Sequence, residues 1–240
     1  MEIDSGNGRR EIPAALNRAD WRQVPATPID RWIVGVDLGQ VSDPTAICVL
    51  NHRVVALDNW TPSEGRRLWR QDSTEHFDIK HLERLPLGSS YPSQVAHVGN
   101  LLSRAPLNGA KLVVDETGVG RPVCDLFDQA GLKPTRLTIT GGLEQTQTGG
   151  RSYHVPKGML ISALEARLHT KELRIAKELT DAPALQSELE DFQRKVNEAG
   201  RPSYNARQGA HDDLVLSCAI ALWYAVTRPS SEWSIMNNAF

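Results

Sequence analysis

The feature that most constrains this chain is a strongly apolar helix near its end, opened by two adjacent acids. Residues 213–226 are mostly aliphatic or alanine. One stripe at helical spacing consists of Val215, Ala219, Leu222 and Val226. This stripe is expected to be buried, with the helix closing the domain against the elements that precede it.

The two opening acids, Asp212 and Asp213, admit two interpretations. Asp212 lies three residues before Val215, so it continues the stripe and is expected to point inward, whereas Asp213 is rotated by about 100°. A carboxylate aimed at a core is costly unless it is neutralised, and a divalent cation is one such partner. The alternative is that either acid only caps the helix and interacts favourably with its dipole.

Composition narrows the class of protein. The chain has 240 residues, of which 40% are hydrophobic and 23% charged, as in a globular protein with one sizeable domain. No apolar run approaches the length of a membrane span. The three cysteines lie in apolar elements and are expected to be reduced core residues. The formal net charge of −2 does not indicate nucleic-acid binding, although an acidic metal site would offset basic charge elsewhere.

We expect three parts along the chain. Residues 1–30 are interrupted by prolines, sustain no helical or strand period, lack a secretory signal, and are expected to be a leader or linker. Residues 31–228 are expected to form one domain, and residues 229–240 a polar tail.

The first half of this domain is expected to be rich in strands. Residues 31–39 are apolar almost throughout, which predicts a central strand that ends in an acid and a glycine. Residues 45–50 and 53–60 predict two strands that Asn51 and His52 would join as an antiparallel hairpin. Residues 61–74 are expected to be an exposed insertion.

The second half predicts alternating strands and helices. A strand over 111–115, a helix from 121 to Gly131 and a strand over 135–140 imply parallel pairing. The glycine-rich residues 141–150 predict a mobile loop. Further helices are expected over 91–105, 155–169 and 184–196, the last with Leu185, Leu189 and Phe192 inward, and extended pieces over 173–175 and 202–206. The predicted class is α/β, a mixed sheet whose antiparallel hairpin strands continue into parallel strands, flanked by helices.

Two acids follow strands of this sheet. Asp37 and Asp115 lie at the carboxyl ends of their strands, where ligand sites of open α/β sheets lie. If the strands are neighbours, the carboxylates lie side by side, and the last helix can bring Asp212 to them. Such acids cannot all ionise unaided, and Mg²⁺ or Mn²⁺ would resolve this. Two ions about 4 Å apart would clamp the attacking and leaving oxygens of a phosphodiester displacement.

Three motifs occur in a defined order along the chain. They are Val-Gly-Val-Asp37-Leu-Gly with Asp43-Pro44, Val-Val-Asp115-Glu-Thr-Gly-Val-Gly, and Gly-Ala-His211-Asp212-Asp213. Together they resemble the nuclease domain of tailed-phage terminase large subunits, which has an RNase H-like fold related to RuvC-type resolvases. The resemblance covers roughly residues 32–226.

This resemblance implies a metal-dependent endonuclease that cleaves concatemeric viral double-stranded DNA during genome packaging. Asp37, Asp115 and Asp212 match the catalytic, metal-binding triad, and Asp213 and Asp43 match accessory acids. The helical phase favours Asp212 over Asp213 as the direct ligand. The implied partners are DNA, a packaging ATPase, the small terminase subunit and the portal, in the cytoplasm of a bacterial host and without a membrane.

Other interpretations remain open. Lys157, at the start of a predicted helix, is a candidate for contact with DNA phosphate or an ordinary surface lysine, and Asp43-Pro44 is also typical of a turn. The sequence lacks the phosphate-binding loop of the terminase motor, so an isolated nuclease domain, a split gene product or a degenerate remnant is expected, without an ATPase motor. The alternatives are a RuvC-like Holliday junction resolvase and a non-catalytic DNA-binding or packaging module. A kinase-like ATPase would need two such halves, for which the chain is too short.

Overall fold

The computed structural model describes residues 21–39, 43–118, 121–191, 193–196, 202–205 and 211–228. They form two compact units. The sheet unit comprises the described residues within 31–52 and 76–228, and the hairpin unit comprises residues 21–30 and 53–75. The division into leader, nuclease domain and tail stays a prediction, because 1–20 and 229–240 lie outside the described residues.

A mixed sheet forms the centre of the sheet unit. Its strand order is β4-β3-β2-β5-β6-β8-β7, with β9 beside β4. Strands β2, β5, β6 and β8 pair in parallel, and β7 pairs with β8 in antiparallel fashion. This confirms the predicted fold class. The strands are β2 (Ile29–Asp37), β3 (Ala46–Ser63), β4 (Leu68–Arg84), β5 (Lys111–Asp115), β6 (Thr135–Thr140), β7 (Thr146–Gly149), β8 (Ser152–Pro156) and β9 (Leu173–Ile175).

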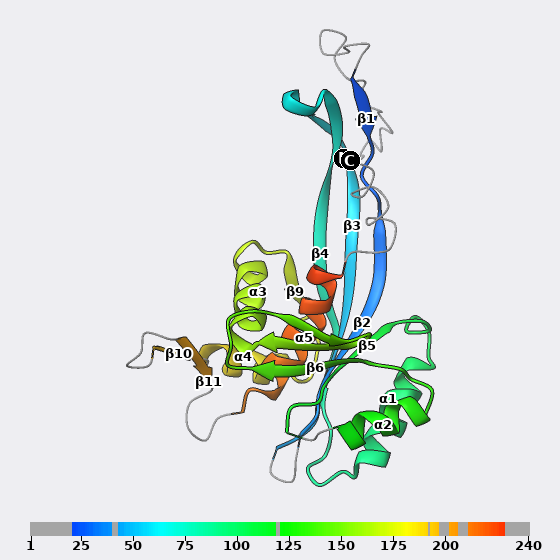
Figure 1. The fold of residues 1–240 in the computed structure, drawn as a ribbon, viewed down its shortest axis with the longest axis vertical. Helices are drawn as coiled ribbons and strands as arrows, with labels where there is room; N and C mark the ends of the chain where they lie inside the picture. The colour runs from blue at the N-terminus through cyan, green and yellow to red at the C-terminus, as the bar shows by residue number, and fades with distance from the viewer. Residues whose placement is uncertain are drawn as a thin grey trace, which may run out of the picture. The chain divides into compact units, whose positions relative to one another are not determined.

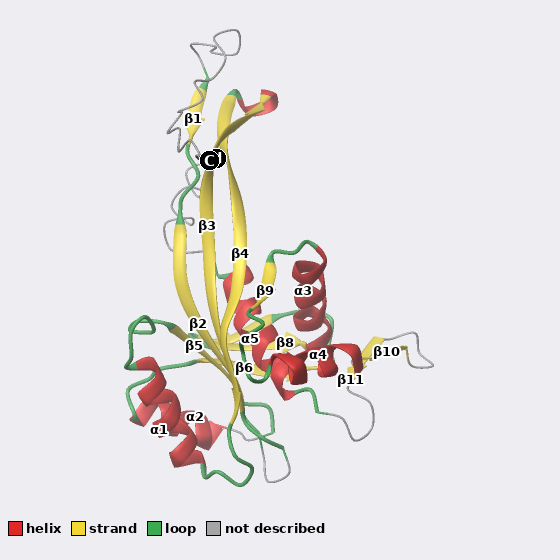
Figure 2. Ribbon diagram, turned by 180° about the vertical axis from the view of Figure 1, so that it is seen from behind, coloured by secondary structure: helices red, strands yellow, loops and turns green. Residues whose placement is uncertain are grey.

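Helices cover both faces of this sheet (Figures 1 and 2). Helices α1 (Tyr91–Leu102) and α2 (Arg121–Gln129) cover one face, and α3 (Lys157–His169), α4 (Ala182–Asp191) and α5 (Asp213–Thr227) cover the other. Along β2, Val34 and Val36 belong to the core under α1 and α2, whereas Ile33 belongs to the core under α5. This alternation decides which strand residues face α5. None of the helices in the described ranges is long and apolar enough to cross a membrane.

Helix α5 lies directly on strand β2 at Gly35. A Cβ at this position would lie 2.3 Å from the backbone oxygen of Ser217 and 2.9 Å from the Cβ of Ala221. The helix is buried on every side from Asp213 to Trp223, so the single predicted stripe is too narrow, and Val226 at its end is 39% exposed. Only glycine leaves room for this contact, which fixes the position of α5 on the sheet.

The predicted turn at Asn51 and His52 is wrong, because β3 runs through both residues without interruption. Both side chains are buried, the Nε of Arg31 donates to the Nδ1 of His52 at 3.0 Å, and the His52 ring stacks on Phe77 with centroids 4.7 Å apart. Burial among these partners keeps two polar residues inside a strand. The predicted antiparallel hairpin between residues 45–50 and 53–60 is therefore not formed.

Two further predictions differ from the structure. Residues 141–150 contain β7, which pairs with β8, instead of forming only a loop. The helix predicted over 184–196 ends at Asp191, and β10 (Gln193–Val196) then pairs with β11 (Pro202–Asn205) in antiparallel fashion. Phe192, predicted to point inward, lies outside the described residues.

The hairpin unit is built from residues 53–63 of β3 and 68–75 of β4, which the 3-10 turn η2 (Glu64–Arg66) joins. Strand β1 (Arg22–Val24) pairs in parallel with residues 68–70. Gln71 of β4 links the chain segments on either side of it, because its side chain donates to the carbonyl of Leu57 in β3 at 2.7 Å and accepts from the backbone N–H of Ala26, just after β1, at 3.2 Å. The predicted insertion over 61–74 is thus part of a strand hairpin, and the predicted leader contains a strand.

Candidate active site

Asp37 and Asp115 end two adjacent parallel strands and are register partners. Val113, two residues before Asp115, belongs to the core under α5. Gly35, two residues before Asp37, contacts α5 directly. Because strand residues alternate between the two faces, both acids lie on the face covered by α5. The structure therefore brings these two predicted residues together, at the sheet edge where the sequence places them.

Asp115 is held by its own turn. It is 5% exposed, and its Oδ1 accepts from the backbone N–H of Thr117 at 2.9 Å and from the Thr117 hydroxyl at 2.5 Å. The Thr117 hydroxyl oxygen in turn accepts from the backbone N–H of Ile139 at 2.7 Å. Burial raises the pKa of Asp115 to about 6, although the hydrogen bonds from Thr117 oppose that rise.

Asp37 is the acid of the site whose ionised form is opposed by burial and by three neighbouring carboxylates. Burial raises the pKa of Asp37 well above its usual range, and the negative charges of Asp115, Asp212 and Asp213 raise it further. The ammonium group of Lys157 acts in the opposite direction. The site thus concentrates negative charge that the protein itself only partly neutralises.

Asp212 is the N-cap residue of α5, yet its side chain makes no capping hydrogen bond. Its Oδ2 instead lies 2.7 Å from the Nζ of Lys157, the first residue of α3. The carboxylate of Glu188 lies at the N-terminus of α5 instead, where its Oε2 accepts from the backbone N–H of Val215 at 2.9 Å. The capping interpretation is therefore wrong for Asp212.

Asp213 is a buried acid that forms an ion pair with the partly buried Arg84. The Arg84 Nε donates to the Asp213 Oδ2 at 2.6 Å, and the same guanidinium also contacts the carboxylate of Glu188. The side chain of Asp213 is 7% exposed and that of Asp212 is 26% exposed, so the predicted order of burial is reversed. Because α5 is buried on all sides, its phase cannot identify the inward acid. Which of the two would bind a metal directly stays a prediction.

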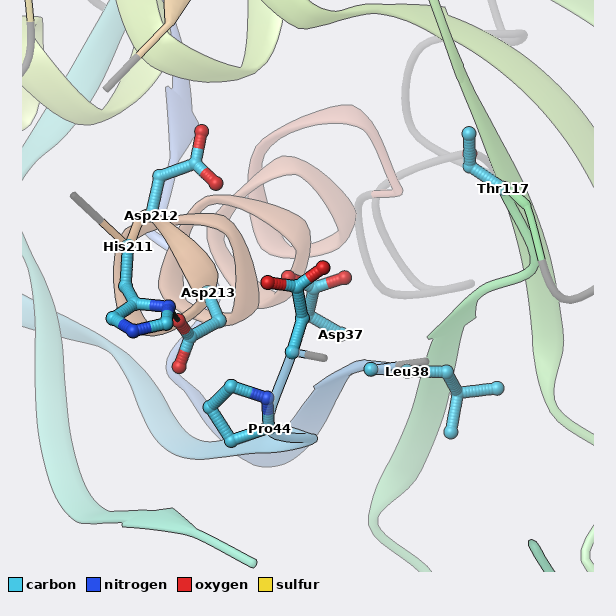
Figure 3. Close-up of a pocket in the computed structure, with 9 residues that line it drawn as sticks. Asp37, Leu38, Pro44, Thr117, His211, Asp212 and Asp213 are labelled. Carbon is cyan, nitrogen blue, oxygen red and sulfur yellow. Dashed lines mark ion pairs between the residues drawn. The ribbon is translucent and has the colours of Figure 1, made fainter. Parts of the chain in front are cut away.

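Several of these acids line a hollow of about 330 Å³. Figure 3 shows Asp37, Asp212 and Asp213 around it, with the carboxylate of Asp213 turned toward His211 and that of Asp212 turned away. Asp43 also lines the hollow, whereas Asp115 and Lys157 do not. Each acid singled out in the sequence is thus either a wall of this hollow or the register partner of one.

These residues suit a hard divalent cation in their chemistry. Within the described ranges, no group of three or more His, Cys, Asp or Glu side chains is gathered closely enough to hold a metal ion as it lies. The available donors are carboxylate oxygens, which Mg²⁺ and Mn²⁺ prefer. Burial, together with neighbouring carboxylates, raises the pKa of Asp37 and of Asp115, so a bound cation would favour the ionised form of both acids.

The sequence analysis missed Arg84 and Glu188, which fix the beginning of α5. Glu188 lies on the inward stripe of its helix, three residues after Leu185 and beside Leu189. An acid within an apolar stripe is a signal that it has a buried partner. Arg84 ends a long strand and carries no comparable signal.

Comparison with solved structures identifies the fold. The large terminase nuclease of thermophilic phage G20c with bound cobalt matches with a TM-score of 0.56 and 23% identity, covering 81% of each chain. The nuclease domain of the large terminase of Thermus phage P74-26 matches with a TM-score of 0.54 and 19% identity, covering 87% of this chain and 93% of that one. The chain has the fold of a large terminase nuclease domain.

The terminase nuclease fold bears out the resemblance that the three motifs carry. The magnesium-bound nuclease of phage G20c matches equally well, with a TM-score of 0.55, 22% identity and 82% of each chain covered. No protein-family model matches the sequence, and no match was found among curated proteins. The relationship is therefore visible in the arrangement of the strands and helices rather than in overall sequence similarity.

The Arg84 pair yields a prediction for stability. Arg84→Met is expected to lower the free energy of unfolding by about 3 kcal/mol at pH 8, because it leaves two buried carboxylates without their cation. The loss should be smaller at pH 5, since burial raises the pKa of Glu188 to about 7 and this group is then neutral. Urea unfolding in the presence of a chelator measures both values.

The control is Arg104→Met, which alters an exposed arginine at the end of α1 and is expected to change stability by less than about 0.5 kcal/mol. Equal unfolding free energies for the two variants would show that the Arg84 pair does not hold α5.

Proposed function

We propose that this chain is a divalent-metal-dependent DNA endonuclease of the terminase type, which hydrolyses phosphodiester bonds of viral DNA during genome packaging. The observation that carries the proposal is the register pairing of Asp37 with Asp115 on the face where α5 presents Asp212 and Asp213. The terminase nuclease fold supports it, because the large terminase nuclease of phage G20c, which shares this fold, has been solved with bound cobalt and with bound magnesium.

In this proposal Asp37, Asp115 and Asp212 hold Mg²⁺ or Mn²⁺, with two ions in the site, and Asp43 and Asp213 assist them. A bound ion supplies a Lewis acid for the scissile phosphate and lowers the pKa of a water molecule. Thr117 holds the carboxylate of Asp115 in place. Arg84 and Glu188 bind the first residues of α5 and so hold Asp212 and Asp213 in place.

Lys157 has two successive roles in this proposal. Its ammonium group is the counter-ion of Asp212 in the metal-free protein. If Asp212 held a cation, Lys157 would lose this partner and its ammonium group would bind a DNA phosphate. The packaging ATPase, the small terminase subunit and the portal are the proposed partners.

Cleavage of supercoiled plasmid tests this function. We expect nicked and linear products with Mn²⁺ or Mg²⁺ and none with a chelator, because in this proposal the cation supplies the Lewis acid and lowers the pKa of the attacking water. Asp58→Asn, which removes an exposed acid of the hairpin unit, is the control and should cut like the wild type. A folded wild-type protein that cuts with neither metal would overturn the proposal in favour of a DNA-binding module. Cleavage confined to four-way junctions would favour a resolvase.

A further inference from the structure

A second hollow lies at the opposite end of β5 from Asp115. It has a volume of about 390 Å³, and its lining includes Lys111, the first residue of β5. Four of its lining residues are cationic, and none is an aspartate or glutamate. The cations come from separate segments of the sheet unit and are Lys111, Lys133, Arg151 and Arg228. We refer to this surface as the basic hollow.

Two of these cations are uncommitted. Lys111 and Lys133 are exposed, and neither side chain forms a hydrogen bond or ion pair with another residue of the described ranges. The backbone of Lys133 has a φ of 46°, a left-handed conformation that is unfavourable for a lysine and the more so before Pro134. Such strain persists where the surrounding structure holds a residue in place.

The other two cations are held by the fold. The guanidinium of Arg228 lies 4.3 Å from the centroid of the Tyr153 ring, and Arg151 pairs with Asp128 at 3.1 Å. The basic hollow therefore combines two arginines that contact other side chains with two exposed lysines. These cations come from separate segments and three of them are exposed, an arrangement that suits an extended chain of negative charges better than one small enclosed anion.

Electrostatics supplies the reason for such a surface. The acids around Asp37 repel phosphate groups, and the whole chain carries a formal charge of −2. Affinity for DNA comes mainly from cations that displace the counter-ions of its phosphates, so it must come from a region away from these acids. Asp212 lines the hollow beside Asp37, and Arg228 lines the basic hollow. These two residues lie at the two ends of α5, about 24 Å apart at about 1.5 Å per residue, a distance spanned by about seven base pairs of duplex.

We propose that the basic hollow binds the phosphate backbone of double-stranded DNA and supplies affinity that the acidic site cannot supply. This inference rests on the proposed function, because it takes DNA as the substrate. An acidic protein segment is the competing occupant, and it would leave DNA affinity independent of these lysines.

The test compares three single charge reversals, Lys111→Glu, Lys133→Glu and Lys171→Glu. Lys171 is an exposed lysine at the end of α3 that does not line the basic hollow, so it controls for the change in net charge. Binding of a fluorescent 30-base-pair duplex is measured by anisotropy in a chelator, at several salt concentrations. We expect about a tenfold weaker Kd for each hollow variant, with a salt slope smaller by about 1, and less than a twofold change for Lys171→Glu.

Equal effects in all three variants, or unchanged binding in the hollow variants, would overturn the inference. Plasmid cleavage by the wild type separates this inference from the proposed function. DNA binding that depends on Lys111 and Lys133 without cleavage would contradict only the nuclease activity. Cleavage by a protein whose affinity does not depend on these lysines would contradict only the basic hollow.

Discussion

Replacing Asp115 with asparagine is expected to abolish DNA cleavage and, in the same protein, to stabilise the metal-free fold. Asparagine has the same shape, and its side-chain oxygen can still accept the two hydrogen bonds from Thr117. It lacks the charge that a cation needs as a ligand, so cleavage should fall on the order of a thousandfold, which corresponds to about 4 kcal/mol of lost transition-state stabilisation.

The gain in stability follows from the pKa of Asp115, which burial raises from 3.8 to about 6. A carboxyl group that binds its proton more tightly in the folded state makes folding less favourable as pH rises from about 4 to about 6. Above about pH 6 the carboxyl group is ionised in both states, and its burial lowers the free energy of unfolding by the full amount. Asp115→Asn removes this cost, so we expect about 3 kcal/mol of added stability at pH 8 and almost none at pH 4.

Two measurements on the same preparation check this pair of effects. Urea unfolding in a chelator at pH 4 and pH 8 gives the stability difference, and plasmid nicking with Mn²⁺ gives the activity. A stable variant that has lost cleavage would identify Asp115 as a functional acid that opposes folding. A variant that cuts normally would remove Asp115 from the site, and one that is destabilised at pH 8 would show that its charge supports the fold.

Gly35→Ala is expected to reduce both stability and cleavage, although Gly35 touches no part of the hollow. The new methyl group would lie 2.3 Å from the backbone oxygen of Ser217, and a helix backbone cannot yield as a side chain does. Overpacking of this kind costs about 3 kcal/mol. If α5 moves away, it takes Asp212 and Asp213 with it, and a displacement of about 1 Å lowers cleavage on the order of a hundredfold.

Gly99→Ala is the matched control for this substitution. Gly99 lies inside α1, where an added Cβ would be 3.7 Å from the nearest side-chain atom of Leu132, which is an ordinary contact. A glycine within a helix is less favourable than alanine, so this variant should be as stable as the wild type or more so, by about 0.5–1 kcal/mol. Thermal unfolding and plasmid cleavage are measured for both variants. Equal stability and equal cleavage in the two would contradict the role of Gly35.

Local patterns were sufficient to predict the elements that carry the acids. The strands over 111–115 and 135–140 have their predicted bounds, because short apolar runs between turn residues leave few alternatives. The neighbouring positions of Asp37 and Asp115 follow from parallel pairing at a shared sheet edge. These predictions depend on features that lie within a few residues of each other.

Partners far apart in the chain could not be predicted in the same way. His52 remains in a strand because Arg31 and Phe77 cover it, and neither contact has a local signal. Arg84 is 129 residues from Asp213, so their ion pair arises only when β4 meets the end of α5. The burial of Asp213 was missed for a related reason, since one apolar stripe was taken as the whole buried surface of a helix that is surrounded on all sides.

The pleat of β2 and β5 makes the site sensitive to chain length as well as to side-chain identity. Asp37 and Asp115 face α5 only because each lies an even number of residues from a side chain or glycine that packs on that helix. Inserting or deleting one residue within either strand would turn its terminal carboxylate to the face covered by α1 and α2. Composition and hydrophobicity would hardly change, yet the two acids would lie on opposite sides of the sheet.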